Sequence, residues 1–115
     1  MIPPSLTQEI TALHANICSA LADSSRILIL YALSEKPCSV GALAEELGIS
    51  QSAASRHLNI LRERGLVIST REGQLVVNTL ADVRVIQALD LLRAVLTSKL
   101  RTQAALATSD YSTNK

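Results

Sequence analysis

Aromatic side chains are almost absent from this chain of 115 residues, which has two tyrosines and neither tryptophan nor phenylalanine. Because 48% of the residues are nonetheless hydrophobic, the core must be built from Leu, Ile, Val and Ala, which suit packed helices. We therefore expect a mainly α-helical protein. The length is that of one domain, so we expect residues 1–107 to form a single domain and the polar residues 108–115 to form a flexible tail.

Long hydrophobic runs are also missing. No stretch approaches the roughly 20 apolar residues that span a bilayer, and the N-terminus lacks a basic segment followed by a continuous hydrophobic one. We expect a cytoplasmic protein with no membrane partner. The formal net charge is only +1, so the overall composition does not by itself indicate a nucleic-acid partner.

Cysteine is scarce, since the chain has only Cys18 and Cys38. Two cysteines are too few for a disulfide framework, and these two do not form a close metal-ligand pair in the sequence. The residue sets of enzymes are missing as well: there is no clustered nucleophile and base, no phosphate-cradling glycine loop and no pair of carboxylates. We expect no enzymatic activity, no cofactor and no bound metal.

Two helices are indicated in the first third of the chain. Apolar residues recur at helical spacing from Leu6 to Leu21 and place one hydrophobic face on a first helix. Asp23 is a suitable N-cap for a second helix, which must end before Pro37. This second helix is almost wholly apolar, so we expect it to be central in the fold.

Two short helices follow, joined by a tight connection. Ser39 and Ser50 are suitable N-caps for them, and Gly48 can adopt the left-handed conformation that ends the first of the two. The second ends near Gly65. Two short helices in this arrangement are typical of a helix-turn-helix.

After Gly65 the hydrophobic period changes from about 3.6 to about two, which predicts a β-hairpin with Gly73 in its turn. A long helix is then expected from Asp82 to about Ala107. Its apolar stripe is wider than a small monomer easily covers. This stripe and the matching stripe on the first helix favour a dimer interface, although a plain core helix is the alternative.

Five segments closely resemble the ArsR-type family of bacterial winged-helix repressors (ArsR/SmtB): Leu21–Leu30, Ser39–Ala44, Ser50–Leu58, Leu61–Val67 and Arg71–Gly73. The resemblance covers about residues 21 to 80. It implies a winged helix-turn-helix of order α-α-α-α-β-β-α, in which the terminal helices form a homodimer interface. It also implies binding to a palindromic operator in double-stranded DNA, usually under the control of a metal, metalloid or redox signal.

The expected DNA contacts lie on the fourth helix and on the hairpin, which is the wing of such a fold. They are Gln51, Ser52, Ser55, Arg56, Arg71 and Gln74. Amide and guanidinium groups pair with base edges, and short hydroxyls reach bases or phosphates. Residues 50–71 also hold four arginines, including Arg62 and Arg64, against Glu63, a local charge of +3. The alternative for these residues is an ordinary solvated helix face and surface turn.

The two metal sites usual in the family lack their ligands here. Relatives place thiolates on the third helix in a Cys-Val-Cys type pattern, where this chain has Ser39 and Gly41, with Cys38 displaced by one residue. On the last helix Asp82 is kept, but the other ligand positions hold Arg84, Val95 and Ser98. One hypothesis is that Cys18 and Cys38 sense a metalloid or an oxidant, with His14 four residues from Cys18; the alternative is two reduced, structural thiols. His57 is expected to have a structural role.

The sequence thus predicts a sequence-specific DNA-binding transcriptional regulator, a repressor that acts as a homodimer on an inverted-repeat operator and is released by a thiol-reactive or metalloid signal. The effector itself is not identified by the sequence. The alternative is a winged-helix module that binds another protein and has no specific affinity for DNA.

Overall fold

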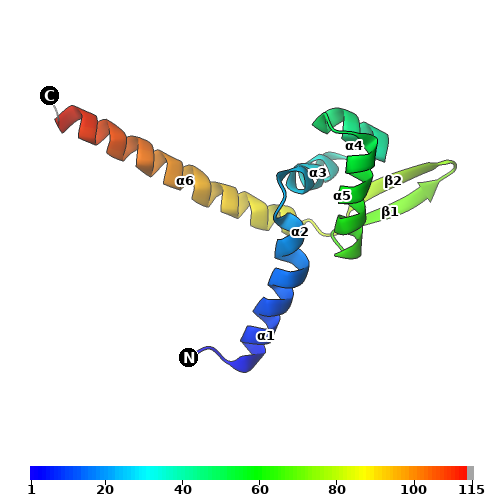
Figure 1. The fold of residues 1–115 in the computed structure, drawn as a ribbon, viewed down its shortest axis with the longest axis horizontal. Helices are drawn as coiled ribbons and strands as arrows, with labels where there is room; N and C mark the ends of the chain where they lie inside the picture. Colours follow the sequence, from blue (N-terminus) through cyan, green and yellow to red (C-terminus); the bar gives the residue numbers. More distant parts are fainter. Residues whose placement is uncertain (114–115) are drawn as a thin grey trace. The chain divides into compact units, whose positions relative to one another are not determined.

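The computed structural model describes residues 1–113, and the side chains of residues 1–107. It divides into two compact units, Met1–Val83 and Arg84–Lys115. The first contains the helices α1 to α5 and the hairpin β1–β2, and the second contains the helix α6 (Figure 1). The order is that of a winged helix-turn-helix and confirms the expected fold class.

The first helical segment is interrupted by a π-helical turn. It consists of α1 (Pro4–Leu13), the π-helix η1 (His14–Cys18) and α2 (Ser19–Leu21). In η1 the backbone N–H of Ser19 donates to the carbonyl of His14, an i→i+5 bond that gives this turn one residue more than an α-helical turn. The first helix expected from Leu6 to Leu21 is present, and this π turn lies inside it. In α1 itself Leu6, Ile10 and Leu13 share a face and are 40–50% exposed.

Asp23 begins helix α3 (Ser24–Glu35) as expected. Its Oδ1 accepts hydrogen bonds from the backbone N–H groups of Ser25 at 2.8 Å and Arg26 at 3.3 Å, which satisfies two donors of the first helical turn. Partial desolvation alone would raise the pKa of Asp23, but the hydrogen bonds from Arg26 and Ser25 and the charge of nearby His57 hold it below its usual value.

Helix α3 forms the centre of the core of the first unit. Ile29, Leu30 and Leu33 are buried, as are residues on the neighbouring elements: Ala20, Leu43, Ala44, Ala54, Leu58, Leu61, Leu66 and Val67. The helix is central as expected, but only one side of it is buried, because Leu28 is 55% exposed.

Helices α4 (Val40–Leu47) and α5 (Gln51–Glu63) form the helix-turn-helix. The hydroxyl oxygen of Ser39 accepts from the N–H of Ala42, and that of Ser50 accepts from the N–H of Ala53. Gly48 ends α4 with φ 68°, in the left-handed region. Because each signal is local in the sequence, the two helices begin and end where the caps predict.

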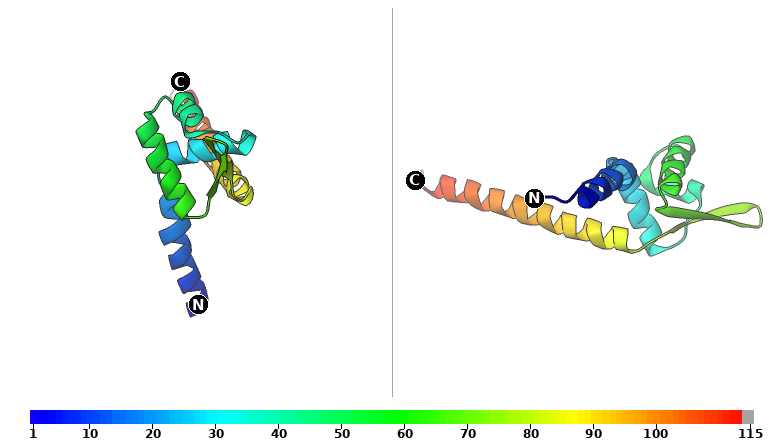
Figure 2. Two further views of the ribbon diagram at one scale, coloured as in Figure 1. Left: turned by 90° about the vertical axis from the view of Figure 1, so that its right-hand side faces the viewer. Right: turned by 90° about the horizontal axis from the view of Figure 1, so that it is seen from below.

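The wing is an antiparallel hairpin of β1 (Val67–Glu72) and β2 (Leu75–Leu80), in which Glu72 pairs with Leu75. The two residues between the strands are Gly73, with φ 66°, and Gln74. A positive φ at the first turn residue suits the right-handed twist of a hairpin. Figures 1 and 2 show the wing extending away from the helices of its unit.

Helix α6 (Arg84–Thr113) continues beyond the end expected near Ala107. Of the expected tail 108–115, residues 114 and 115 lie outside the described residues. Large apolar side chains on α6 are 55–70% exposed: Leu91, Leu92, Val95, Leu96, Leu100 and Leu106. No single helix among the described residues has the length and apolarity needed to cross a membrane; the pair Pro4–Leu21 and Ser24–Glu35, bent by 83°, meets that test jointly by length and composition.

Candidate nucleic-acid interface

The N-terminal half of α5 presents the four expected contact residues. Gln51, Ser52 and Arg56 are exposed, and Ser55 is half-buried. The opposite side of the helix carries the buried Ala54, Leu58 and Leu61. Burial of that side fixes which face of α5 is turned outward, since side chains 100° apart per residue divide into two faces.

The two expected wing residues are exposed near the tip of the hairpin. Arg71 pairs with Val76 in the strand register, and Gln74 lies in the turn. Glu72, between them, is exposed as well. The strand β1 packs against α5, so the wing is attached to the helix that carries the other expected contacts.

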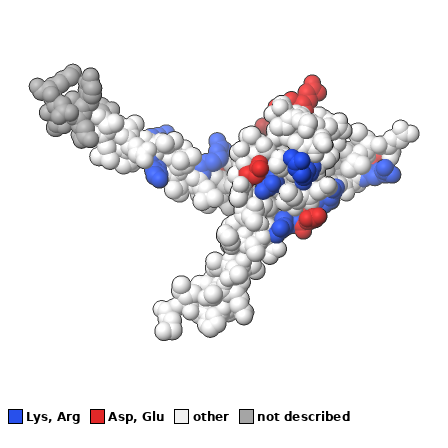
Figure 3. Space-filling model, in the orientation of Figure 1, with Lys and Arg blue, Asp and Glu red and all other residues white. Residues whose placement is uncertain are grey.

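The four arginines of residues 50–71 fall into two classes. Arg64 donates from Nη1 to the carbonyl of Ala15 at 2.7 Å, and Arg62 donates to Ser69 Oγ at 2.9 Å and to Asn59 Oδ1. Arg56 and Arg71 have no hydrogen-bond or ion-pair partner among the described side chains. The local charge of +3 therefore overstates the cations available to a ligand, because two of the four hold the fold together. Figure 3 shows basic side chains over α5 and on the wing.

His57 is half-buried and takes part in packing between helices. Its Nδ1 lies 3.4 Å from Arg26 Nη1, while Arg26 Nε donates to the carbonyl of Ala20 at 2.6 Å and Nη2 to that of Ser19 at 3.3 Å. These carbonyls belong to α2. One arginine thus joins α2, α3 and α5, which supports the structural role expected for His57.

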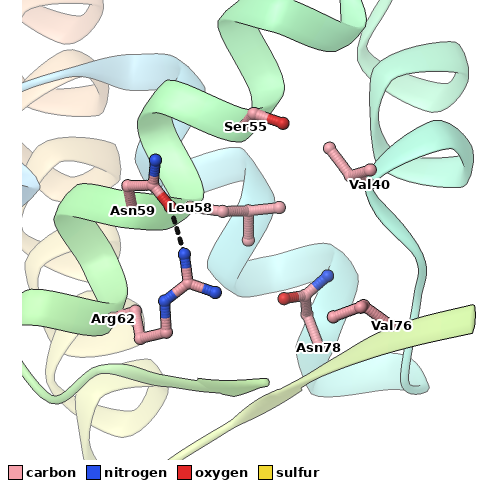
Figure 4. A pocket seen from close by; sticks show the side chains of 7 residues that line it. All are labelled: Val40, Ser55, Leu58, Asn59, Arg62, Val76 and Asn78. Carbon is pink, nitrogen blue, oxygen red and sulfur yellow. Dashed lines mark hydrogen bonds between the residues drawn. The ribbon is translucent and has the colours of Figure 1, made fainter. Parts of the chain in front are cut away.

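A buried asparagine links the wing to the rest of the unit, and sequence reasoning missed it. Asn78 in β2 is 2% exposed; its Oδ1 accepts from Ser69 Oγ at 2.6 Å and its Nδ2 donates to the carbonyl of Cys38 at 3.1 Å. It borders a cavity of about 220 Å³ whose other lining residues are Val40, Ser55, Leu58, Asn59, Arg62 and Val76 (Figure 4). The sequence does contain a signal for it. Asn78 directly follows the apolar residues Leu75, Val76 and Val77 of an expected strand, and asparagine is rare in strands.

The two cysteines occupy different surroundings. Cys18 is exposed at the end of η1, whereas Cys38 is 5% exposed, with Sγ 3.3 Å from the carbonyl of Lys36. Burial raises the pKa of the Cys38 thiol, and the Glu46 carboxylate raises it further. Because the thiolate is the reactive form, Cys38 is poorly suited to fast reaction. Among the side chains of residues 1–107, no group of three or more His, Cys, Asp or Glu is placed to hold a metal ion.

Comparison with known proteins gives the same assignment as these features. Residues 23–69 match the model of the family described as "Bacterial regulatory protein, arsR family". The transcriptional regulator NmtR of Mycobacterium tuberculosis is 42% identical over 85 residues, which is 74% of this chain and 71% of NmtR.

Two solved structures are similar over most of their length. The crystal structure of Rv0081 from M. tuberculosis has a TM-score of 0.74 at 31% identity and covers 83% of this chain and 96% of its own. The homodimeric winged helix-turn-helix domain of Mb0332 from Mycobacterium bovis has a TM-score of 0.72 at 29% identity, with 82% and 87% covered. The capped helix-turn-helix, the wing and these likenesses agree, and the chain belongs to the arsR family of bacterial regulatory proteins.

Proposed function

We propose that this protein is a cytoplasmic, DNA-binding transcriptional repressor that acts as a homodimer on an inverted-repeat operator. The observation that carries the proposal is the exposed N-terminal half of α5, on which Gln51, Ser52 and Arg56 face outward from a buried opposite side. A helix presented in this way fits the major groove, with its first residues at the base edges. The family to which the chain belongs consists of regulatory proteins, and these side chains can form hydrogen bonds with base edges.

Each expected contact has a distinct role in the proposal. Gln51 pairs with an adenine, Arg56 with a guanine or a phosphate, and the hydroxyls of Ser52 and Ser55 reach bases or phosphates without holding the helix away from the groove. On the wing, Arg71 and Gln74 contact the sugar-phosphate backbone or the minor groove. The carboxylate of the adjacent Glu72 repels phosphate and limits how closely the tip of the wing approaches DNA.

The exposed apolar side chains of the terminal helices support the dimer. In α1 they are Leu6, Ile10 and Leu13, and in α6 they begin at Leu91. Exposed apolar surface of this extent marks an interaction site in a protein that stays in solution, and the similar Mb0332 domain is described as homodimeric. A two-fold dimer places two copies of α5 about one turn of DNA apart, so its operator is an inverted repeat.

The signal that releases DNA is proposed to act on a thiol, with Cys18 the more accessible of the two. Arsenite and a polysulfide are titrated separately against the DNA complex of the wild type and of the Cys18→Ser and Cys38→Ser variants. Failure of release in the Cys18→Ser variant alone is the expected result, and zinc is expected not to release DNA. Identical release curves for all three proteins would remove both cysteines from the mechanism.

The function is tested by selecting bound duplexes from fragmented genomic DNA with the wild-type protein and measuring their affinity by fluorescence anisotropy. We expect selection of an inverted repeat, affinity in the nanomolar range, and weaker binding by the Arg56→Ala variant. The second candidate, a protein-interaction module, keeps the same fold. It would be favoured if the wild-type protein enriched no duplex from the genomic fragments.

A further inference from the structure

A continuous chain of hydrogen bonds runs from α5 through the wing to the loop before α4. Arg62 in α5 donates to Ser69 Oγ at 2.9 Å, Ser69 donates to Asn78 Oδ1 at 2.6 Å, and Asn78 Nδ2 donates to the Cys38 carbonyl at 3.1 Å. Ser69 and Asn78 are direct partners in the register of β1 and β2. The chain therefore crosses both strands of the wing at one level.

Asn78 is held to Cys38 by the backbone as well. The N–H of Cys38 donates to the Asn78 carbonyl at 3.1 Å, and the N–H of Asn78 donates to the Cys38 carbonyl at 2.8 Å. Asn78 is thus fixed on one side of β2 by an isolated β-bridge to Cys38 and on the other side by Ser69 of β1. A buried amide left without partners is costly, so these bonds select one placement of the side chain.

The wing also contacts α3, α4 and α5, but the part of it near the tip has little apolar packing. A two-stranded hairpin is only marginally stable by itself, and the apolar side chains Ile68, Leu75 and Val76 of this hairpin are 40–55% exposed. In β2 the most deeply buried side chain is the polar Asn78. The attachment of the wing to α5 thus depends on polar bonds whose geometry is directional, in addition to the packing of β1.

We infer that Asn78 is a positioning residue for DNA binding: through Ser69 and Arg62 it sets the placement of the wing relative to α5. This inference rests on the proposed function. Arg71 is two residues beyond Ser69 along β1, or about 7 Å at the usual rise of a strand. A change of strand direction at Ser69 is therefore carried to Arg71, while Gln51 and Arg56 on α5 stay in place.

The same bonds keep Arg62 away from DNA. Its two terminal nitrogens are engaged by Ser69 and Asn59 (Figure 4 shows the Asn59 bond). Replacing Asn78 leaves Ser69 with one partner fewer and loosens this arrangement. Asn78 thus acts on DNA binding through other residues, without touching DNA itself.

The test is a double-mutant cycle between Asn78→Ala and Arg71→Ala, which lie at different levels of the hairpin because Asn78 pairs with Ser69 and Arg71 with Val76. Binding is measured with the duplex selected by the wild-type protein, at several salt concentrations between about 50 and about 200 mM. In the wild type, Arg71→Ala is expected to weaken binding about three- to tenfold and to lower the salt slope by about 0.9 for each protomer. In the Asn78→Ala background the wing is already misplaced, so Arg71→Ala is expected to change the affinity less than about twofold.

A second variant covers the case in which Asn78→Ala does not fold. Ser69→Ala removes the central hydroxyl of the chain but keeps the Asn78 amide bonded to Cys38, and Ser69→Thr keeps the hydroxyl and is expected to restore wild-type affinity. Thr70→Ala is the matched control, because Thr70 is the next residue on β1, is exposed and forms no side-chain hydrogen bond with the described residues. Thermal unfolding of each variant separates an effect on stability from an effect on placement, since lower stability alone leaves the Arg71 effect unchanged.

The outcomes separate the two proposals. If the wild-type protein enriches no duplex, the proposed function itself is wrong. If it binds its selected duplex and Arg71→Ala weakens binding equally in the wild-type and the Ser69→Ala or Asn78→Ala backgrounds, DNA binding stands and the role of Asn78 is overturned. If Arg71→Ala has no effect even in the wild type, the wing does not contact DNA and the inference is overturned as well.

Discussion

Arg56 within α5 and Arg64 at its C-cap should give different results when replaced by alanine, although each change removes one positive charge. Arg56 is exposed and has no partner among the described side chains, whereas Arg64 Nη1 donates to the Ala15 carbonyl at 2.7 Å and lies 3.4 Å from Asn16 Oδ1. Arg56→Ala should therefore affect DNA binding, and Arg64→Ala should affect stability.

The magnitudes follow from these interactions. If Arg56 binds a phosphate, its replacement in both protomers of a dimer lowers the salt slope of binding by about 1.8 in total, because each neutralised phosphate contributes about 0.9. If Arg56 reads a guanine instead, the slope changes little and affinity falls by about 1–3 kcal/mol for each half-site. A charge-assisted hydrogen bond contributes up to about 3 kcal/mol, but the Arg64 bonds are exposed, so we expect Arg64→Ala to destabilise the fold by about 1 kcal/mol, or to lower the melting temperature by about 5 °C.

Affinity is measured by fluorescence anisotropy across a salt series, and stability by thermal unfolding at one fixed protomer concentration, because a dimer's melting temperature depends on concentration. Arg64→Ala should bind with the wild-type slope at temperatures where it is folded. Equal slope changes in the two variants would refute the reasoning, since they would show that binding depends on total charge and not on which arginines lack partners.

Three further predictions concern the fold and its thiols. The pKa of Asp23 is lowered, so its carboxylate stabilises the fold at pH values above the ordinary pKa of aspartate, and this contribution disappears as the pH falls through the lowered pKa. In denaturation experiments, the free energy of unfolding of Asp23→Ala should therefore fall less steeply at acid pH than that of the wild type. Gly48 has φ 68°, so Gly48→Ala should cost about 1 kcal/mol in chemical denaturation, whereas Gly41→Ala, inside α4 at ordinary φ with open space around the site, should be neutral or stabilising. A colourimetric thiol reagent should label Cys18 quickly and Cys38 only as the protein opens, and a fast phase that persists in Cys18→Ser would contradict the burial of Cys38.

The parts of the fold that the sequence predicts are those with local causes. Asp23, Ser39 and Ser50 cap the helices they were expected to cap, and Gly48 and Gly73 adopt positive φ where a helix ends and a hairpin turns. Each signal involves atoms within about three residues of one another. The order of elements follows from these signals together with the change of hydrophobic period.

The parts that escape prediction depend on residues distant in the chain. The partner of Arg64 is a carbonyl 49 residues away, and that of Asn78 is 40 residues away. The hydrophobic spacing of the first helix did not predict the π turn at His14–Cys18. For the expected contact residues, the sequence predicts which face of α5 they occupy. It does not predict which arginines are hydrogen-bonded within the fold, so a count of arginines cannot tell Arg56 from Arg64.

That distinction changes what kind of DNA binding is expected from a nearly neutral protein. If all four arginines of residues 50–71 neutralised phosphates, a dimer would release counterions with a salt slope of about 7; with Arg56 and Arg71 alone, it is about 3.6. A small slope means that non-specific binding, which is almost entirely electrostatic, is weak. Affinity for the operator must then come mainly from the amide and hydroxyl groups that face the bases, so raising the salt should remove random-sequence DNA well before it removes the operator. A slope near 7 measured with the selected duplex would show instead that Arg62 and Arg64 leave their partners in the complex.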